Sequence, residues 1–538
     1  MYSNKKINKN NLLYPSLFLI FIVIGLNSFQ DFGISIDENF HLSNGLHYYS
    51  FFKGLFFDGS EFLTLKELKR SFNEHHFKDP ALFDFFVAFL IDIFNIQEIE
   101  KIYFLRHFLI FLIFLIGIFY FYLILKNRFS NNYIIIFGLA LLFFSPRIFA
   151  NSFYNNKDLI FLSVSCIFFY YGIKFLDKPS AGNAIIFGIF SALAFDTRIM
   201  AIVYIFAFYV TFFLSCLDDK KIQVSKIKNL LIIVTTTILF IYFLWPYLWV
   251  DPINNVIDFF SVIRDETPSI QILYFGDYFF SKSTPWHYNI IWILFTSPLT
   301  IIILFITGFL TISIKIFNNL MDVENKTHKF WYNKSELVDI FLFLSFTLSF
   351  FMKVKFGVDY CGWRHIYFLY PLIIIIGLTS FESLKKTKKN KLISKSLFTI
   401  IFLELVFLSV WNYKNHPFQF VYFNPIFKSF TKNNFDLDYW GISNRSILEK
   451  IYSADKNIKT KITTISFTNL NDSLRILKPE IREKISIVHD LKDADYVIDN
   501  HIKKWNSTPG EETLKNNFSI FYELIVDGNV INTVYKRN

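Results

Sequence analysis

Charged residues and cysteines are both scarce in this chain. Only 18% of its 538 residues are Asp, Glu, Lys or Arg, whereas 53% are hydrophobic and 20% are aromatic. The cysteines Cys166, Cys216 and Cys361 lie far apart and form neither a disulfide framework nor a metal-binding motif. This composition excludes a disulfide-rich secreted domain and indicates a polytopic α-helical membrane protein.

Proline and glycine are too few, at 14 and 18 residues, for a long disordered linker. The sequence contains neither an internal repeat nor a low-complexity segment. The net charge of +10 does not predict nucleic-acid binding, because the lysines lie in short loops between apolar runs. The first apolar run lacks a small-residue cleavage site, so we expect an uncleaved helix.

The apolar runs predict about eleven membrane-spanning helices, since a span needs roughly 20 apolar residues. They lie at 12–29, 102–125, 132–149, 158–176, 183–195, 199–216, 228–249, 288–314, 336–352, 365–381 and 396–412. Run 183–195 is short enough to be a half-helix. Run 80–95 is also short and carries Asp84 and Asp92, which predicts an amphipathic helix at the membrane surface.

Lysines in alternate loops predict the orientation of the chain. They lie in the N-terminal tail, after the sixth run and before the last run: Lys5, Lys6, Lys9, Lys220, Lys221, Lys226, Lys228, Lys385, Lys386, Lys388, Lys389, Lys391 and Lys395. With the spans above, all three groups share one face, which the positive-inside rule makes cytoplasmic. The N-terminus is then cytoplasmic, while loop 31–101 and the C-terminal region lie outside.

The composition changes near residue 413 to that of a soluble domain. Alternating or β-rich segments predict strands at 462–467, 485–488 and 496–498, a short helix at 471–479, and a hairpin over 518–535. The hairpin is expected to turn at Asp527-Gly528-Asn529. The chain is therefore expected to divide into a transmembrane domain, 1–412, and a small outer α/β domain, 413–538.

Ionisable residues gather at the predicted outer ends of the spans. Asp37 and Glu38 follow the first apolar run, and this pair alone also fits an ordinary polar loop. The outer cations, placed against the positive-inside bias, are Arg147, Lys157, Arg198, Arg364 and His365. They call for an anionic partner, either a phosphate or the carboxylates Asp37, Asp158 and Asp196. For any single arginine, a salt bridge between helix ends is the alternative.

Three motifs follow one another in order. The acidic pair comes first, then Arg147 with Asn155-Asn156-Lys157-Asp158, then Trp286-His287-Tyr288 before Thr296-Ser297-Pro298. This order resembles the GT-C membrane glycosyltransferases, in particular the protein O-mannosyltransferase and aminoarabinose-transferase group, over most of residues 12–381.

The chain departs from the family pattern at one place. Many members carry His-Pro-Pro in the first outer loop, where this chain has His75-His76-Phe77-Lys78-Asp79-Pro80-Ala81-Leu82. This difference leaves the acceptor open. Further along, Phe435 to Ser443 resembles the start of an outer domain of bacterial members.

The resemblance implies a hexosyltransferase that moves a sugar from a polyprenyl-phosphate donor to an acceptor hydroxyl at the outer face, with inversion. Asp37 would be the general base, Glu38 would orient the base or acceptor, and Asp158 would be a second acid or the partner of an arginine. The expected phosphate-binding residues are Arg147, Lys157, Arg198, Arg364 and His365. The expected acceptor or sugar pocket contains Asn155, Trp286, His287 and Tyr360.

No cofactor is assigned, since no compact metal-ligand spacing is present; Asp37 and Asp158 would be the ligands if a divalent ion is used. The expected partners are membrane lipid, the polyprenyl-phosphate sugar and an acceptor of open identity, without nucleic acid. The expected location is the bacterial inner membrane, as a multi-pass protein whose site faces the periplasm.

Two other functions compete with sugar transfer. A transporter or flippase for a lipid-linked or anionic solute would use intramembrane charges along a pathway. The charges here cluster at helix ends instead, and no paired broken helices are visible in the sequence. In the third interpretation, the chain is a non-catalytic assembly subunit whose soluble domain binds partners.

Overall fold

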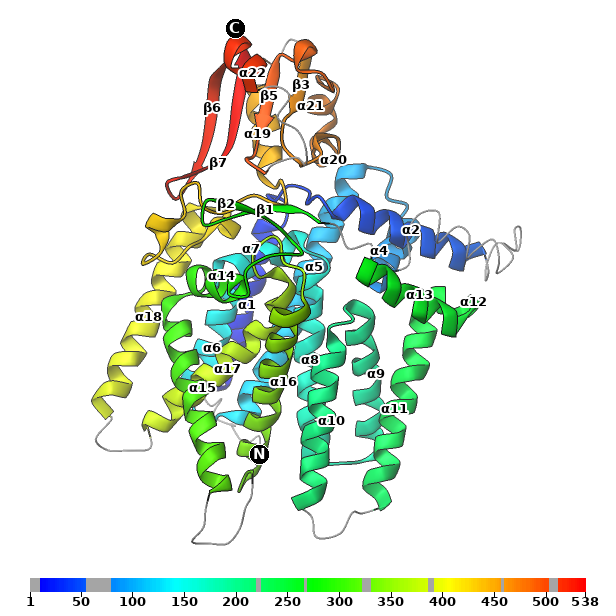
Figure 1. The fold of residues 1–538 in the computed structure, drawn as a ribbon, viewed down its shortest axis with the longest axis vertical. Helices are drawn as coiled ribbons and strands as arrows, with labels where there is room; N and C mark the ends of the chain where they lie inside the picture. The colour runs from blue at the N-terminus through cyan, green and yellow to red at the C-terminus, as the bar shows by residue number, and fades with distance from the viewer. Residues whose placement is uncertain are drawn as a thin grey trace, which may run out of the picture.

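The structure is a computed structural model that describes residues 10–54, 79–218, 224–265, 269–321, 330–385, 391–455, 459–502 and 511–538. A bundle of long helices carries a small α/β domain at one end (Figure 1). The start of α1, the start of α11 and the start of α18 lie at the opposite end of the bundle. The predicted mostly helical membrane protein with a C-terminal α/β domain is confirmed.

Seven described helical segments are long and apolar enough to cross a membrane, and one bent pair raises this number to eight. The seven are α5 (Ile99–Arg128), α8 (Asp158–Asp177), α11 (Val224–Leu244), α15 (Leu299–Leu320), α16 (Lys334–Phe356), η2 (Arg364–Leu369) with α17 (Tyr370–Lys385), and α18 (Lys391–Lys414). Three shorter apolar helices are α1 (Asn10–Ser28), α9 (Ala181–Thr197) and α10 (Ala201–Asp218). The predicted total of eleven requires these three to cross as well, and it stays a prediction.

Two predicted spans are broken at proline. Residues 132–149 form α6 (Asn132–Phe144) and the start of α7 (Pro146–Tyr154), which meet at 59°. Residues 288–314 form α14 (Tyr288–Thr296) and then α15, with extended backbone at Ser297. Proline disfavours helical backbone angles at the residue before it. It also lacks the backbone N–H that would continue the helical hydrogen bonds. Each of these two predicted spans is therefore made of two helices in the structure.

The predicted outer loop contains two packed helices, α2 (Glu38–Lys53) and α4 (Leu82–Ile93). Helix α2 lies at the end of the bundle that bears the C-terminal domain and projects to the right of that domain, above α13 (Figure 1). The two helices approach closely at Gly45, where any side chain would collide with the backbone of Asp84. Residues His75 to Lys78, where the chain departs from the family pattern, lie outside the described residues.

The C-terminal domain is built on a five-stranded sheet in the order β4-β3-β5-β7-β6. Its strands are β3 (Thr460–Thr464), β4 (Ile485–Ile487), β5 (Tyr496–Asp499), β6 (Phe518–Val526) and β7 (Asn529–Arg537). Strand β3 runs parallel to β4 and β5, and β7 runs antiparallel to β5 and β6. Every predicted strand is present. The hairpin turns at Asp527 and Gly528, both with positive φ, as a two-residue turn requires.

The remaining short elements lie between the long helices, between the bundle and the sheet, or between the strands of the sheet. They are α12 (Tyr247–Val250), α13 (Pro252–Asp265), β1 (Gln271–Tyr274), β2 (Asp277–Phe280), η4 (Gln419–Val421), η5 (Lys428–Phe430), α19 (Ser443–Ala454), α20 (Leu470–Leu474), α21 (Pro479–Arg482), η6 (Leu491–Asp493) and α22 (Glu511–Asn517). The β1–β2 hairpin, which the sequence did not predict, lies between bundle and sheet domain (Figure 1). Side chains between 418 and 442 share the main hydrophobic core with the helices, whereas Ile447, Ile462 and Val534 belong to a separate core.

Candidate active site

One buried arginine contacts two of the predicted acids. Arg364, the first residue of η2, places Nη1 3.3 Å from Oδ2 of Asp37 and 3.7 Å from Oδ2 of Asp158. Asp37 directly precedes α2 and Asp158 begins α8, so segments far apart in sequence meet here. The side chain of Asp37 is 37% exposed, whereas Asp158 and Arg364 are buried. Asp37 is therefore the accessible carboxylate of this group.

The carboxylate of Asp158 is held from several directions. Asn155 donates to its Oδ2 at 2.9 Å, and the Asn155 side-chain oxygen accepts from the Asp158 backbone N–H at 2.9 Å. Arg198, which follows α9, forms an ion pair with Oδ1. Asp158 is thus the common partner of two arginines, one of the two roles predicted for it.

Aromatic rings surround the guanidinium of Arg364. Its Cζ lies 4.6 Å from the ring centre of Tyr360 and 4.4 Å from that of Trp440. Both distances suit cation–π contact. The neighbouring His365 packs edge-on against Tyr360 and places Nδ1 3.2 Å from Nζ of Lys353. His365 therefore joins the pair that Lys353 forms with Asp359 at 2.7 Å.

Arg147 is buried between the rings of Trp292 and Phe423, with Cζ 4.8 and 5.2 Å from their centres. Its Nε donates to the carbonyl of Tyr422 at 3.3 Å, and no ion pair to a described carboxylate is present. Its Nη2 has no hydrogen-bond partner within the described part of the chain. A buried donor without a partner is unfavourable, so this arginine offers an N–H group to an anion.

Arg198 and Arg364 share this property with Arg147. In each of the two, the buried Nε lacks a hydrogen-bond partner among the described residues. Lys157 differs, because its Nζ is paired with Asp79 at 2.6 Å. Of the cations predicted to bind phosphate, the three arginines are therefore those with a buried donor that lacks a partner among the described residues.

Glu38 lies in a separate, fully buried cluster. Its Oε2 accepts from the backbone N–H of Ser35 at 2.7 Å, and its Oε1 lies 3.2 Å from Nε2 of His107. Arg106 lies 3.8 Å from Glu38 and pairs with Asp84 at 2.5 Å. Glu38 thus ties the start of α2 to α5, immediately beside Asp37. Arg106 and His107 were not predicted as site residues, although two ionisable residues inside the apolar run 102–125 are a signal for a functional role.

The predicted acceptor residues divide into two groups. Asn155 and Tyr360 contact Asp158 and Arg364, as described above. Trp286 is 70% exposed, and His287 shares a 2.7 Å hydrogen bond with the hydroxyl of Tyr274 in β1. The described contacts of Trp286 and His287 include none to Asp37, Asp158 or Arg364.

The described side chains at this site are not arranged to bind a divalent metal ion. No group of three or more His, Cys, Asp or Glu side chains within the described ranges is arranged to hold a metal. Asp37 and Asp158, the ligands that the sequence would offer, both contact the positive guanidinium of Arg364. A cation between these carboxylates would be repelled by that guanidinium. All three cysteines are free thiols.

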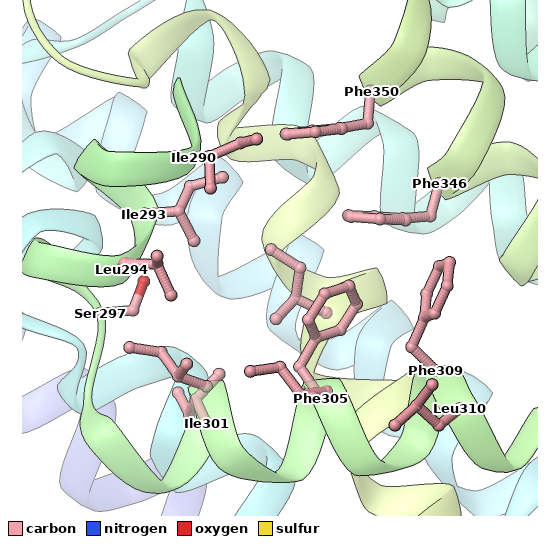
Figure 2. A pocket seen from close by; sticks show the side chains of 13 residues that line it. Ile290, Ile293, Leu294, Ser297, Ile301, Phe305, Phe309, Leu310, Phe346 and Phe350 are labelled. Carbon is pink, nitrogen blue, oxygen red and sulfur yellow. The ribbon is translucent and has the colours of Figure 1, made fainter. Parts of the chain in front are cut away.

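An apolar cavity of about 440 Å³ opens between α14, α15, α16 and α17. Figure 2 shows Ile290 and Ile293 of α14 facing Phe305 of α15 and Phe346 of α16 across this space. Ser297 supplies its one polar side chain. Helix α14 also carries Trp292, the ring that covers Arg147, so the cavity and this guanidinium adjoin the same helix.

Comparison with known proteins gave one family match. Residues 78–247 match the family model described as "Dolichyl-phosphate-mannose-protein mannosyltransferase". The matched segment contains Arg147, Asp158 and Arg198, whereas Asp37 and Arg364 lie outside it. A search of curated proteins gave no significant match.

Solved structures that are similar over most of the chain include two of ArnT from Cupriavidus metallidurans. The crystal structure of ArnT from Cupriavidus metallidurans bound to undecaprenyl phosphate has 11% identity and a TM-score of 0.45, and covers 97% of each chain. Its apo state has 9% identity and a TM-score of 0.45, and covers 96% of this chain and 97% of that one. With the family model matched over residues 78–247, the predicted resemblance to the GT-C membrane glycosyltransferases is confirmed.

Proposed function

We propose that the protein transfers a sugar from a polyprenyl-phosphate donor to an acceptor hydroxyl at the outer face of the membrane, with inversion at the anomeric carbon. The observation that carries this proposal is the contact of Arg364 with both Asp37 and Asp158. This contact brings the accessible carboxylate of Asp37 together with the buried guanidinium of Arg364, at the end of the bundle that bears the C-terminal domain. The family match supports glycosyl transfer as the class of chemistry.

Asp37 acts as the general base in this mechanism. Its Oδ2 contacts Arg364, while the partial exposure of the side chain lets an acceptor approach the carboxylate. The acceptor O–H gives its proton to Asp37 as its oxygen bonds to the anomeric carbon of the sugar. The bond from that carbon to the phosphate oxygen breaks, and the polyprenyl phosphate leaves with the electron pair. A single displacement of this kind inverts the configuration.

The arginines stabilise the charge that grows on the leaving phosphate. Arg147, Arg198 and Arg364 each retain a buried N–H without a partner in the described structure. Guanidinium groups match phosphate oxygens in geometry and remain charged when buried. Preorganised donors of this kind favour the transition state because the phosphate carries more negative charge there than in the bound donor.

The lipid tail of the donor has a suitable place in the apolar cavity. The walls are isoleucine, leucine and phenylalanine side chains from helices α14 to α17. Trp292 of the same helix packs on Arg147, so a phosphate at Arg147 and a tail in the cavity would both adjoin α14. A lipid carrier also explains how an outward-facing site obtains an activated sugar, since the membrane itself delivers it.

The function is tested by incubating membranes that contain the full-length protein with a panel of labelled polyprenyl-phosphate sugars. Transfer of label to a hydroxyl-bearing product, with release of polyprenyl phosphate, is the expected result. Matched membranes that lack the protein provide the control. Movement of intact donor across the bilayer without any product would support a flippase instead.

A further inference from the structure

The segment Asp438 to Ser443 of the C-terminal region lies directly against the Asp37–Arg364 pair. The Trp440 ring packs on the Arg364 guanidinium at 4.4 Å, and that of Tyr439 lies at 5.7 Å. The Trp440 carbonyl accepts a 3.1 Å hydrogen bond from the N–H of Ile36, the residue before Asp37. One residue therefore contacts Arg364 with its ring and the Asp37 loop with its backbone.

The conformation of this segment is fixed by hydrogen bonds within it and by contacts with the sheet domain. Asp438 accepts from the backbone N–H groups of Ile442 and Ser443 at 3.0 and 3.1 Å, and Asn500, after β5, donates to its carbonyl at 2.9 Å. Gly441 has φ +70°, and a Cβ there would lie 2.8 Å from the Thr468 side chain. Both the backbone angle and the lack of space require glycine at this position.

Two further contacts hold the Asp37 loop on either side. Arg445 of α19 donates to the carbonyl of Phe32 at 2.9 Å. Arg475 donates to the side chain of Asn39 in α2 at 3.0 Å. With the hydrogen bond from the Ile36 N–H to the Trp440 carbonyl, these contacts show that the C-terminal region touches the chain both before and after Asp37.

We propose that Trp440 is a positioning residue for sugar transfer, which orients Arg364 and the Asp37 loop and thereby makes the C-terminal domain part of the active site. This inference rests on the proposed function. Trp440 and Tyr439 are buried, and their contact with Arg364 is what places them beside the site. An aromatic face fixes the plane of a guanidinium, and displacement of a catalytic group by about 1 Å can lower a rate by about 100-fold.

The first experiment measures transfer by full-length variants in membranes. Trp440→Leu removes the aromatic face but keeps an apolar side chain, and is expected to lower kcat at least tenfold. Trp440→Phe retains a ring and is expected to stay within about threefold of wild type. The matched control Ile462→Ala loosens the core of the sheet domain away from the site and is expected to leave kcat within about twofold.

Two outcomes of this experiment overturn the positioning role. One is an unchanged kcat in Trp440→Leu. The other is an equal loss in Ile462→Ala, because the effect would then come from general loosening of the domain. A loss of kcat confined to Trp440→Leu, restored by phenylalanine, supports the role.

The second experiment separates this inference from the proposed function, because it needs no transfer activity. Thermal unfolding midpoints are measured for Trp440→Phe, Trp440→Leu, Arg364→Lys and the two double variants. Residues in contact give non-additive shifts, whereas independent residues give additive ones. If the shifts are non-additive but the wild-type protein transfers no sugar, the proposed function is rejected while the contact between Trp440 and Arg364 stands. If the shifts are additive, the positioning role is rejected even when transfer is observed. The expected result is non-additivity, larger for leucine than for phenylalanine.

Discussion

Nη1 of Arg364 lies 3.3 Å from Oδ2 of Asp37, although 327 positions separate the two residues along the chain. The loop after the first apolar helix and the start of the η2–α17 segment therefore meet at one point. Asp158 contacts the same guanidinium nitrogen from α8. The candidate site is thus built by packing of three distant segments rather than by a local motif.

The Arg147 guanidinium is expected to contribute to donor binding. Replacing it with methionine keeps an apolar chain between Trp292 and Phe423 but removes the unpartnered N–H. Hydrogen bonds to charged groups contribute about 1.5–3 kcal/mol, so polyprenyl-phosphate binding should weaken by about tenfold or more. Titration of the purified protein with a fluorescent polyprenyl phosphate measures this change.

Lys157→Met provides the comparison for Arg147. Lys157 is paired with Asp79 and partly exposed, so its loss is expected to change binding less than the loss of Arg147. An effect of Lys157→Met equal to that of Arg147→Met would contradict the choice of the arginines as phosphate ligands.

Glu38 is expected to be required for stability. Glu38→Ala leaves Arg106 and His107 without their shared buried carboxylate, which should destabilise the fold by about 3–5 kcal/mol. Asp92→Asn is the control, because Asp92 also ties α2 to a neighbouring helix through Lys53, but at an exposed position. Its cost should stay below about 1 kcal/mol. Denaturant unfolding in detergent micelles compares the two, and similar losses would count against the buried cluster.

Asp436 is expected to make stability fall as the pH rises. Burial raises its pKa to about 7, against an ordinary value of 3.8, while its carboxylate accepts one bond from the N–H of Leu273. Between pH 3.8 and about pH 7, the Asp436 carboxyl therefore stays protonated in the folded protein but has lost its proton in the unfolded chain. The contribution of this proton to stability is complete below about pH 4 and is lost as the pH rises through 7.

The measurement is the thermal midpoint between pH 5.5 and pH 8. Wild type should lose stability over this range, and Asp436→Asn should show a weaker dependence. Asp277→Asn, at an exposed position in strand β2 of the adjoining hairpin, should keep the wild-type slope. A wild-type slope in Asp436→Asn would show that this carboxyl does not titrate as described.

Local patterns predicted the helical segments and the strands of the C-terminal sheet. Apolar runs, alternation in 462–467 and the turn residues at Asp527-Gly528 depend on short-range periodicity, so the sequence carries them directly. The breaks at Pro146 and Pro298 were also local signals, but unbroken hydropathy masked them in the prediction.

The pairing of side chains within the site was less predictable. The acids and arginines were singled out because each lies at a predicted outer helix end, and the structure brings Asp37, Asp158, Arg198 and Arg364 together. The Glu38 cluster and the Trp440–Arg364 contact depend on which faces of distant segments pack together. One sequence holds no periodic signal for such contacts.

The central claim is tested most directly by comparing wild type with Asp37→Asn in single-turnover transfer from a labelled polyprenyl-phosphate sugar. Both proteins should insert in the membrane and bind the donor, but loss of the base should lower the transfer rate by about 100-fold or more. Equal rates of product formation by wild type and Asp37→Asn would contradict the mechanism.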